Sequence, residues 1–259
     1  MILRHNNKIL RHLGNVMEYS RVDASGGLIT YDGDYKIHMF NVSDNFIVNI
    51  GGDVSTLIVG GGGGCPGSFG IYSTGAGGGG QVKQQNITLI PNIYPVIVGL
   101  GDHDSIFAGI TSNKGQRQPQ HDETGATSGS GNVGGNSPYY FISGGGGGDS
   151  HSGYDASTSG KGGDGGEGTH SSISGTDVGY GGGGGGGGYL GSWPSFGGGL
   201  GIDGGGYGGD DNTDPPNPGH FAQNGSTNTG GGGGSEYQAG GNYATLGGSG
   251  VVIIRYKYK

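Results

Sequence analysis

The chain has 259 residues, of which 71 are glycine, and its formal net charge at pH 7 is −8. Glycine makes up about 7% of an average protein, so this composition belongs to a fibrous, disordered or unusually built protein, and it lacks the regular third-position glycine of collagen. The acidic balance excludes proteins that grip nucleic acid or anionic lipid mainly by charge. Aromatic residues flank the eight glycines of 181–188, and flexible linkers rarely carry them, so we expect ordered structure.

Residues 1–24 contain a seven-residue duplication in which Ile-Leu-Arg-His occurs twice, beginning at Ile2 and at Ile9. The second copy suits either a short amphipathic helix or a strand, and the sequence does not decide between them. The region lacks the apolar core of a signal peptide, and no run of about 18 apolar residues could span a membrane. We therefore expect synthesis in the cytoplasm without a signal peptide and no membrane insertion. Cys65 is the only cysteine, which excludes an intrachain disulfide.

From residue 28 the chain has the short, β-branched and aromatic segments of a β-sheet protein. The expected strands are 28–31, 35–40, 45–50, 54–59, 81–90, 93–98, 105–108 and 251–258. The last of these is too apolar to be a bare sheet edge, so we expect it to pair with the early strands. The sequence predicts an all-β fold, with a small β-sandwich formed by 25–108 together with 249–259.

Residues 109–248 form a glycine-rich region with too few aliphatic residues for an ordinary core. The expected conformation is polyglycine II, which has three residues per turn, a rise of about 3.1 Å per residue and no internal hydrogen bonds. Within 160–168 the pattern Gly-x-Gly occurs three times and would place Lys161, Asp164 and Glu167 along one edge. We predict a polyglycine-II helical bundle with long loops, in which 181–188 spans roughly 25 Å as a central helix.

No motif in the chain predicts catalysis. Matches to GxGxxG are expected by chance at this glycine content, and none lies between a strand and a helix. The acidic stretch at 198–203 is interpreted as an acidic corner of the glycine bundle and that at 210–216 as a solvated surface turn, with a calcium site as the less favoured alternative for each. The eight histidines have no paired-ligand spacing. We predict a protein that is not an enzyme and that uses no cofactor or metal.

Several segments resemble, in order, those of the glycine-rich proteins found among bacteriophage tail-fibre components and adhesins. They are Tyr31–Val48, Leu57–Gly64, Tyr94–Gly99, Asn224–Thr229 and Gly247–Tyr256. The resemblance implies a virion structural protein on the particle surface, a tail-fibre or tip adhesin that recognises a host cell-surface glycan or outer protein. The alternatives are a capsid decoration or fibre-shaft protein that binds only other virion proteins and, less favoured, an ice-binding protein.

Under this resemblance, loops held up by the glycine bundle carry the receptor-binding residues. Exposed aromatic rings on a rigid scaffold bind sugars or proteins with little loss of entropy, although the same rings could instead cap the bundle and exclude water. The candidate receptor-binding residues are Tyr139, Tyr140, Phe141, Tyr189, Trp193, Phe196 and Tyr207.

The N-terminal duplication is the predicted attachment to other virion proteins. The candidate anchor residues within 1–24 are Ile2, Leu3, Arg4, Ile9, Leu10 and Arg11. A homo-oligomer, with a trimer as one form, would cover the polar edges of the bundle. No nucleic-acid partner is expected.

Overall fold

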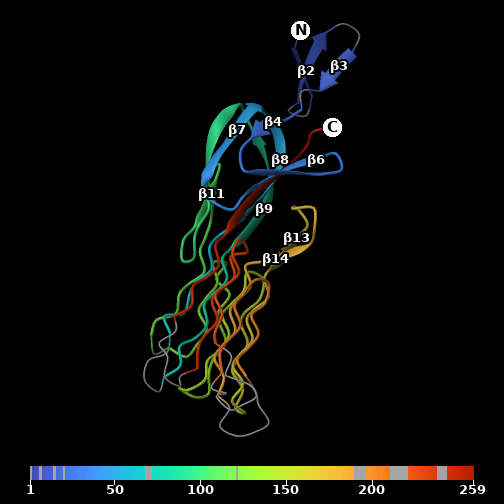
Figure 1. Ribbon diagram of the computed structural model, residues 1–259. Coiled ribbons are helices and arrows are strands. Elements are labelled where there is room, and N and C mark those ends of the chain that lie inside the picture. The colour runs from blue at the N-terminus through green and yellow to red at the C-terminus, as the bar shows by residue number, and fades with distance from the viewer. Residues whose placement is uncertain are drawn as a thin grey trace.

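A computed structural model describes most of the chain. The described residues are 2–5, 8–13, 16–19, 21–67, 72–120, 122–189, 197–210, 221–237 and 244–259. Their regular elements are strands β1 to β15, with no helix among them, which confirms the predicted all-β class. The sheets lie at one end of an elongated molecule, and extended segments run from them to the other end (Figure 1).

The C-terminal strand lies at the centre of one five-stranded antiparallel sheet, named here the β15 sheet. Its strand order is β5-β6-β15-β8-β9. The bounds are Leu28–Asp32 for β5, Tyr35–Phe40 for β6, Val251–Lys257 for β15, Gly52–Val59 for β8 and Val82–Leu89 for β9. Ile253 stands opposite Met39 on one side and Leu57 on the other. The expectation that the apolar C-terminal strand pairs with the early strands is therefore confirmed.

A second five-stranded antiparallel sheet, the β7 sheet, has the order β12-β11-β10-β7-β4. Its strands are β12 (Ile110–Ser112), β11 (Ser105–Phe107), β10 (Asn92–Ile97), β7 (Asp44–Ile50) and β4 (Asp23–Ser25). The two outer strands, β4 and β12, were not predicted from the sequence. Each has three residues, which is too short to display an alternating pattern.

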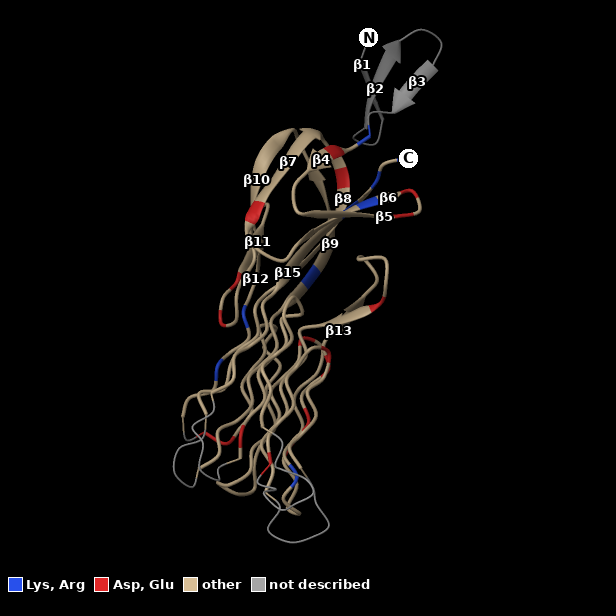
Figure 2. Cartoon of the chain, viewed as in Figure 1, with Lys and Arg blue, Asp and Glu red and all other residues tan. Residues whose placement is uncertain are grey.

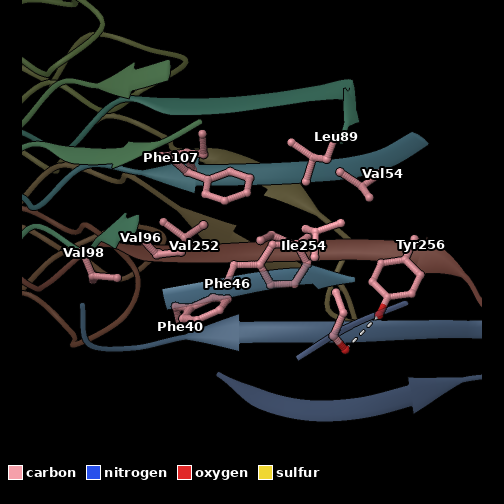
Figure 3. Packing of buried hydrophobic residues seen from close by; sticks show 13 residues of the cluster. Phe40, Phe46, Val54, Leu89, Val96, Val98, Phe107, Val252, Ile254 and Tyr256 are labelled. Carbon is pink, nitrogen blue, oxygen red and sulfur yellow. Dashed lines mark hydrogen bonds between the residues drawn. The ribbon is translucent and has the colours of Figure 1, made fainter. Parts of the chain in front are cut away.

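The two sheets enclose one hydrophobic core (Figure 3). Phe46 lies at its centre and makes edge-to-face ring contacts with Phe40 and Phe107 at centroid distances of 6.1 and 6.0 Å. His38 is also buried, and its Nδ1 donates to the Gly26 carbonyl at 2.7 Å. Its Nε2 therefore accepts from the Tyr256 hydroxyl at 3.0 Å. Burial lowers the pKa of His38, which favours this neutral form.

A short hairpin covers the other face of the β15 sheet. It comprises β13 (Thr169–Ser171) and β14 (Val178–Tyr180). Ile173 and Tyr180 are buried in a second apolar cluster, together with Ile37, Leu57, Val59, Val251 and Ile253. The sequence analysis did not predict this hairpin, because its strands are short and lie within a region otherwise dominated by glycine and polar residues.

The N-terminal duplication forms a three-stranded antiparallel sheet. Its strands are β1 (Ile2–His5), β2 (Lys8–Leu13) and β3 (Val16–Tyr19). The two copies of Ile-Leu-Arg-His pair with each other, with Ile2 opposite Arg11 and Leu3 opposite Leu10. Of the two conformations left open by the sequence, the structure has the strand.

The glycine-rich segments form an array of extended chains beyond the two sheets, named here the glycine array. It consists of 60–64, 74–81, 113–118, 124–136, 143–149, 153–157, 160–168, 181–188, 198–209, 223–225, 230–236 and 245–250. These segments are joined by backbone hydrogen bonds that run between chains distant in sequence. Lys, Arg, Asp and Glu residues are sparse along the array (Figure 2).

The run 181–188 lies inside the glycine array and bonds to five surrounding segments of it and to Thr229, with backbone donor–acceptor distances of 2.7–3.3 Å. In two of the three phases, every third N–H group bonds to the same neighbour: Gly182 to Asp203, Gly185 to Gly206 and Gly188 to Gly209; and Gly183 to Gly166 and Gly186 to Gly163. In the third phase the partners differ: Gly181 bonds to Thr229, Gly184 to Gly77 and Gly187 to Ser143 Oγ. The carbonyl groups of the run accept hydrogen bonds with the same period, so that every third carbonyl bonds to the same neighbour. The carbonyls of Gly181, Gly184 and Gly187 accept from the N–H groups of Asp149, Gly146 and Ser143; those of Gly182 and Gly185 accept from Gly232 and Ser235; and those of Gly183 and Gly186 accept from Ile202 and Gly199.

The backbones in the glycine array approach too closely to admit side chains. A Cβ atom added at Gly183, Gly184 or Gly185 would lie closer than 3.0 Å to a carbonyl oxygen of another segment. Real Cβ atoms essentially never approach that closely. Glycine is therefore required here for the packing of main chain against main chain.

Candidate functional site

The candidate site is the end of the glycine array that lies away from the sheets, named here the tip. A Cβ atom added at Gly181 would lie 3.0 Å from the side chain of Val82 at the start of β9, so the run 181–188 begins beside the β15 sheet. Eight residues of extended chain cover roughly 25 Å. Tyr189, which follows the run, is therefore carried far from the sheets, and several loops turn at this end (Figure 1).

Six aromatic residues gather at the tip and are named here the tip cluster: Tyr72, Tyr139, Tyr140, Phe141, Tyr189 and Tyr237. Phe141 is at its centre, with its ring stacked on that of Tyr139 at a centroid distance of 5.1 Å and an interplanar angle of 4°. The edge-to-face contact of Phe141 with Tyr189 is also at 5.1 Å. The cluster joins loops from four separate parts of the chain.

The outer rings of the tip cluster are accessible to solvent. Tyr139 is 42% exposed and Tyr140 is 50% exposed, whereas Phe141 is half-buried. The turn that carries them is fixed by Ser137, whose Oγ lies 2.7 Å from the Tyr139 carbonyl and 2.9 Å from the Ile142 carbonyl. Ile142 is fully buried. The turn thus rests on a buried side chain and presents its rings outward.

Buried hydroxyl groups support the tip cluster from below. The Ser143 hydroxyl donates to Ser235 Oγ at 2.8 Å and accepts from the Gly187 N–H group at 2.8 Å. Ser235 in turn donates to the Thr74 carbonyl. This network joins the four segments that lead to Tyr72, Phe141, Tyr189 and Tyr237, and it satisfies backbone groups at the end of the array.

A buried carboxyl group lies beside the tip cluster. Glu236 is 5% exposed and immediately precedes Tyr237. Its Oε2 accepts from the Ala222 N–H group at 2.7 Å. Burial, with a smaller contribution from the negative charge of Asp210, raises the pKa of Glu236 to about 7. The side chain therefore connects Ala222 to the segment 230–236 of the array and changes its charge near neutral pH.

The structure brings together four of the seven aromatic residues predicted as receptor contacts: Tyr139, Tyr140, Phe141 and Tyr189. Tyr207 is exposed on a neighbouring segment and, among the described residues, makes no ring contact with the tip cluster. The other two candidates, Trp193 and Phe196, lie outside the described residues.

Sequence reasoning did not identify Tyr72 or Tyr237 as members of the cluster. Each lies close to one end of a glycine run, Tyr72 before 77–80 and Tyr237 after 230–234. Tyr189 has the same position after 181–188. Proximity to a glycine run is therefore a local signal that they share, but it does not distinguish them from Tyr180, which precedes 181–188 and is buried against the β15 sheet.

The candidate anchor residues lie in the N-terminal sheet. Ile2, Leu3 and Arg4 belong to β1, and Ile9, Leu10 and Arg11 belong to β2. The two triplets face each other in register, with Arg4 opposite Ile9. They therefore form one paired ribbon, which is joined to β4 of the β7 sheet through residues 20–22.

The described residues contain no group of three or more histidine, cysteine, aspartate or glutamate side chains that could hold a metal ion. Of the acidic stretch 210–216, only Asp210 is among them. Within the same residues, no helix has the length and hydropathy needed to cross a bilayer. No family model matches the chain, and the search of curated proteins also gave no match.

Proposed function

We propose that the glycine array is a polyglycine-II bundle. The hydrogen bonds of 181–188 support this proposal because the acceptors in all three phases, and the donors in two of them, bond to the same neighbour at every third residue. A helix with three residues per turn produces this period. None of residues 182–188 has φ in the left-handed range. The triplet pattern at 160–168 agrees, since Gly162 and Gly165 face the central run while Gly163 and Gly166 face other segments.

We propose further that the chain is a virion structural protein of a bacteriophage, a tail-fibre or tip adhesin that recognises a receptor on the host surface. The resemblance to glycine-rich fibre components suggests this role. The geometry is suited to it, because a rigid array separates an N-terminal sheet, proposed to bind other virion proteins, from a cluster of loops at the tip. The particle surface is the proposed location, and no catalytic step is invoked.

The tip cluster is the observation that carries the proposed function. Its accessible rings, Tyr139 and Tyr140, lie on a turn held by the buried Ile142 and by Ser137, and they need little further ordering when they bind. Tyrosine offers an apolar face and a hydroxyl group, which together suit the ring faces and hydroxyl groups of sugars as well as protein surfaces. A host glycan or an outer protein is therefore the proposed receptor.

A cell-adhesion assay tests this function. Fluorescently labelled protein is applied to a panel of bacterial strains and to surface polysaccharides isolated from them. The double variant Tyr139→Ser/Tyr140→Ser is expected to lose binding by at least about tenfold, because each exposed aromatic contact contributes roughly 1 kcal/mol or more. Tyr154→Ser is the matched control, since Tyr154 is also an exposed tyrosine but lies on 153–157, on the side of the array.

Equal loss of binding in both variants would contradict a specific role for the tip cluster. If the wild-type protein binds no strain but still assembles onto virus particles, the receptor role is wrong and the decoration or shaft role replaces it. Thermal unfolding of each variant shows whether lost binding reflects lost structure.

A further inference from the structure

The outer edge of the β15 sheet at β5 is an unprotected strand edge. β5 has the sequence Leu-Ile-Thr-Tyr-Asp, and all five residues are exposed, with Leu28 at 59% and Tyr31 at 61%. It pairs with β6 on one side, and no described strand pairs with it on the other. Its one charged residue, Asp32, is neutralised by an ion pair with Arg255 at 2.7 Å.

The other outer strands of the two five-stranded sheets are protected. β4 has three residues and an irregular register between Asp23 and Ala24, and β12 also has three residues. β9 contains Lys83, whose ammonium group bonds to the Thr111 carbonyl of β12. Short strands, bulges and lysines are the means by which proteins prevent pairing at sheet edges. β5 has none of them, so its edge is available for strand addition.

The hairpin register identifies the backbone groups that are free at this edge. Two residues separate Asp32 from Tyr35, so this pair closes the hairpin and exchanges both backbone hydrogen bonds. Bonded and non-bonded pairs alternate along an antiparallel ladder. The N–H and C=O groups of Ile29 and Tyr31 therefore point away from β6, toward the open edge.

We propose that β5 pairs with β5 of a second copy of this chain, antiparallel and about a twofold axis at Thr30. In this register the free groups of Ile29 face those of Tyr31 in the second copy. The side chains then form β-branched and aromatic cross-strand pairs, which are favourable. Asp32 lies opposite Leu28, so the contact brings no like charges face to face, although each chain carries a net charge of −8.

This pairing joins two β15 sheets into one continuous sheet. It is a pairwise contact and so differs from the trimer that the sequence analysis gave as one form of a homo-oligomer, and it does not rest on the proposed attachment role. A five-residue strand is only about 17 Å long, so the contact is small and the complex is expected to be weak. A covalent trap is therefore a better test than a measurement of molecular mass.

Disulfide trapping tests the register directly. With Ile29 and Tyr31 forming the bonded pairs, Thr30 stands opposite Thr30 of the second copy at a Cα separation of about 4.5 Å, within the range of about 4.4–6.8 Å that a disulfide requires. Thr30→Cys is expected to form a disulfide dimer under mild oxidation. Cys65 does not compete, because it is fully buried and burial raises its pKa to about 11.

Ile93→Cys is the matched control, because Ile93 is equally accessible but lies on the outer face of β10, in the other sheet. At equal concentration, Thr30→Cys is expected to give at least about ten times as much dimer. Adding Ile29→Pro should reduce the yield to that of the control, since it removes an N–H group that β6 does not use. Ile29→Lys serves if the proline variant does not fold. Similar dimer yields for Thr30→Cys and Ile93→Cys would overturn the proposal, as would a yield that neither change at Ile29 lowers.

Discussion

Replacement of Gly184 by alanine tests whether the glycine array depends on contact between main chains. Gly184 is at the middle of the central run, where its N–H group bonds to Gly77 and its carbonyl accepts from Gly146. The added methyl group would overlap the carbonyl of Gly233, with the carbonyl carbon 2.6 Å away. A backbone group cannot rotate away as a side chain can, so neighbouring segments must separate.

The expected effect follows from three contributions. Overpacking of a dense interior destabilises by about 1–3 kcal/mol. Separation of the segments weakens two backbone hydrogen bonds, each with a net contribution of about 1 kcal/mol. Alanine also restricts the unfolded chain, which offsets about 0.4–1 kcal/mol. The net destabilisation of Gly184→Ala is therefore about 2–4 kcal/mol, which lowers the unfolding temperature of a chain of this size by roughly 5–15 °C.

Differential scanning calorimetry of wild type, Gly184→Ala and a control measures this effect. The control is Gly52→Ala, because a Cβ atom at Gly52 meets only the side chain of Val22. That side chain can move, so the control should stay within about 1 kcal/mol of wild type. If Gly184→Ala unfolds at the same temperature as Gly52→Ala, the reasoning about main-chain packing is refuted.

Three further predictions concern the tip and the β13–β14 hairpin. Because the pKa of Glu236 is raised to about 7, the folded state holds a proton that the unfolded chain releases near pH 4.5. Denaturant titrations should show that stability falls as pH rises from about 4.5 to 7, by on the order of 3 kcal/mol, and that Glu236→Gln lacks this fall. Hydrogen bonding to Asp177, with added attraction from Asp203, raises the pKa of His170, so NMR titration should find that Asp177→Asn lowers it. Ile173→Ala should destabilise the hairpin by about 2 kcal/mol or more and accelerate amide exchange in β14, whereas exchange in β7 should not change.

The strands of the two sheets, apart from the three-residue β4 and β12, could be predicted because their pattern is local. Tyr35–Phe40 is rich in aromatic and aliphatic residues, and the structure has the strand with the predicted bounds. The apolar composition of 251–258 also predicted that this strand is not a bare sheet edge, and the structure has it at the centre of the β15 sheet. By contrast, the β13–β14 hairpin is stabilised by the burial of Ile173 and Tyr180 against a distant sheet, and no local pattern encodes that contact.

The pairing of segments within the glycine array could not be predicted from the sequence. Gly184 bonds to Gly77, 107 positions earlier in the numbering, and nothing in one glycine run distinguishes it from another. The spacing at 160–168 did predict one exposed edge, on which Lys161 and Asp164 form an ion pair at 2.9 Å. Order in the array thus depends on backbone contacts that leave little trace in the side-chain pattern.

The candidate site could be predicted only in part, for the same reason. Tyr139 and Tyr189 were identified because aromatic residues are conspicuous beside glycine runs. The array then determines which runs end together, and so it alone brings Tyr72 and Tyr237 into the cluster. Their contribution depends on tertiary structure, which one-dimensional spacing does not contain.

Hydrogen exchange of the glycine amides tests the central claim most directly, namely that hydrogen-bonded main chains form a stiff framework. The N–H groups of Gly183, Gly184 and Gly185 bond to three different segments, so the account predicts exchange at least about a thousandfold slower than in an unstructured chain. Exchange at the rate of unstructured glycine in these residues, while the amides of β15 stay protected, would contradict it.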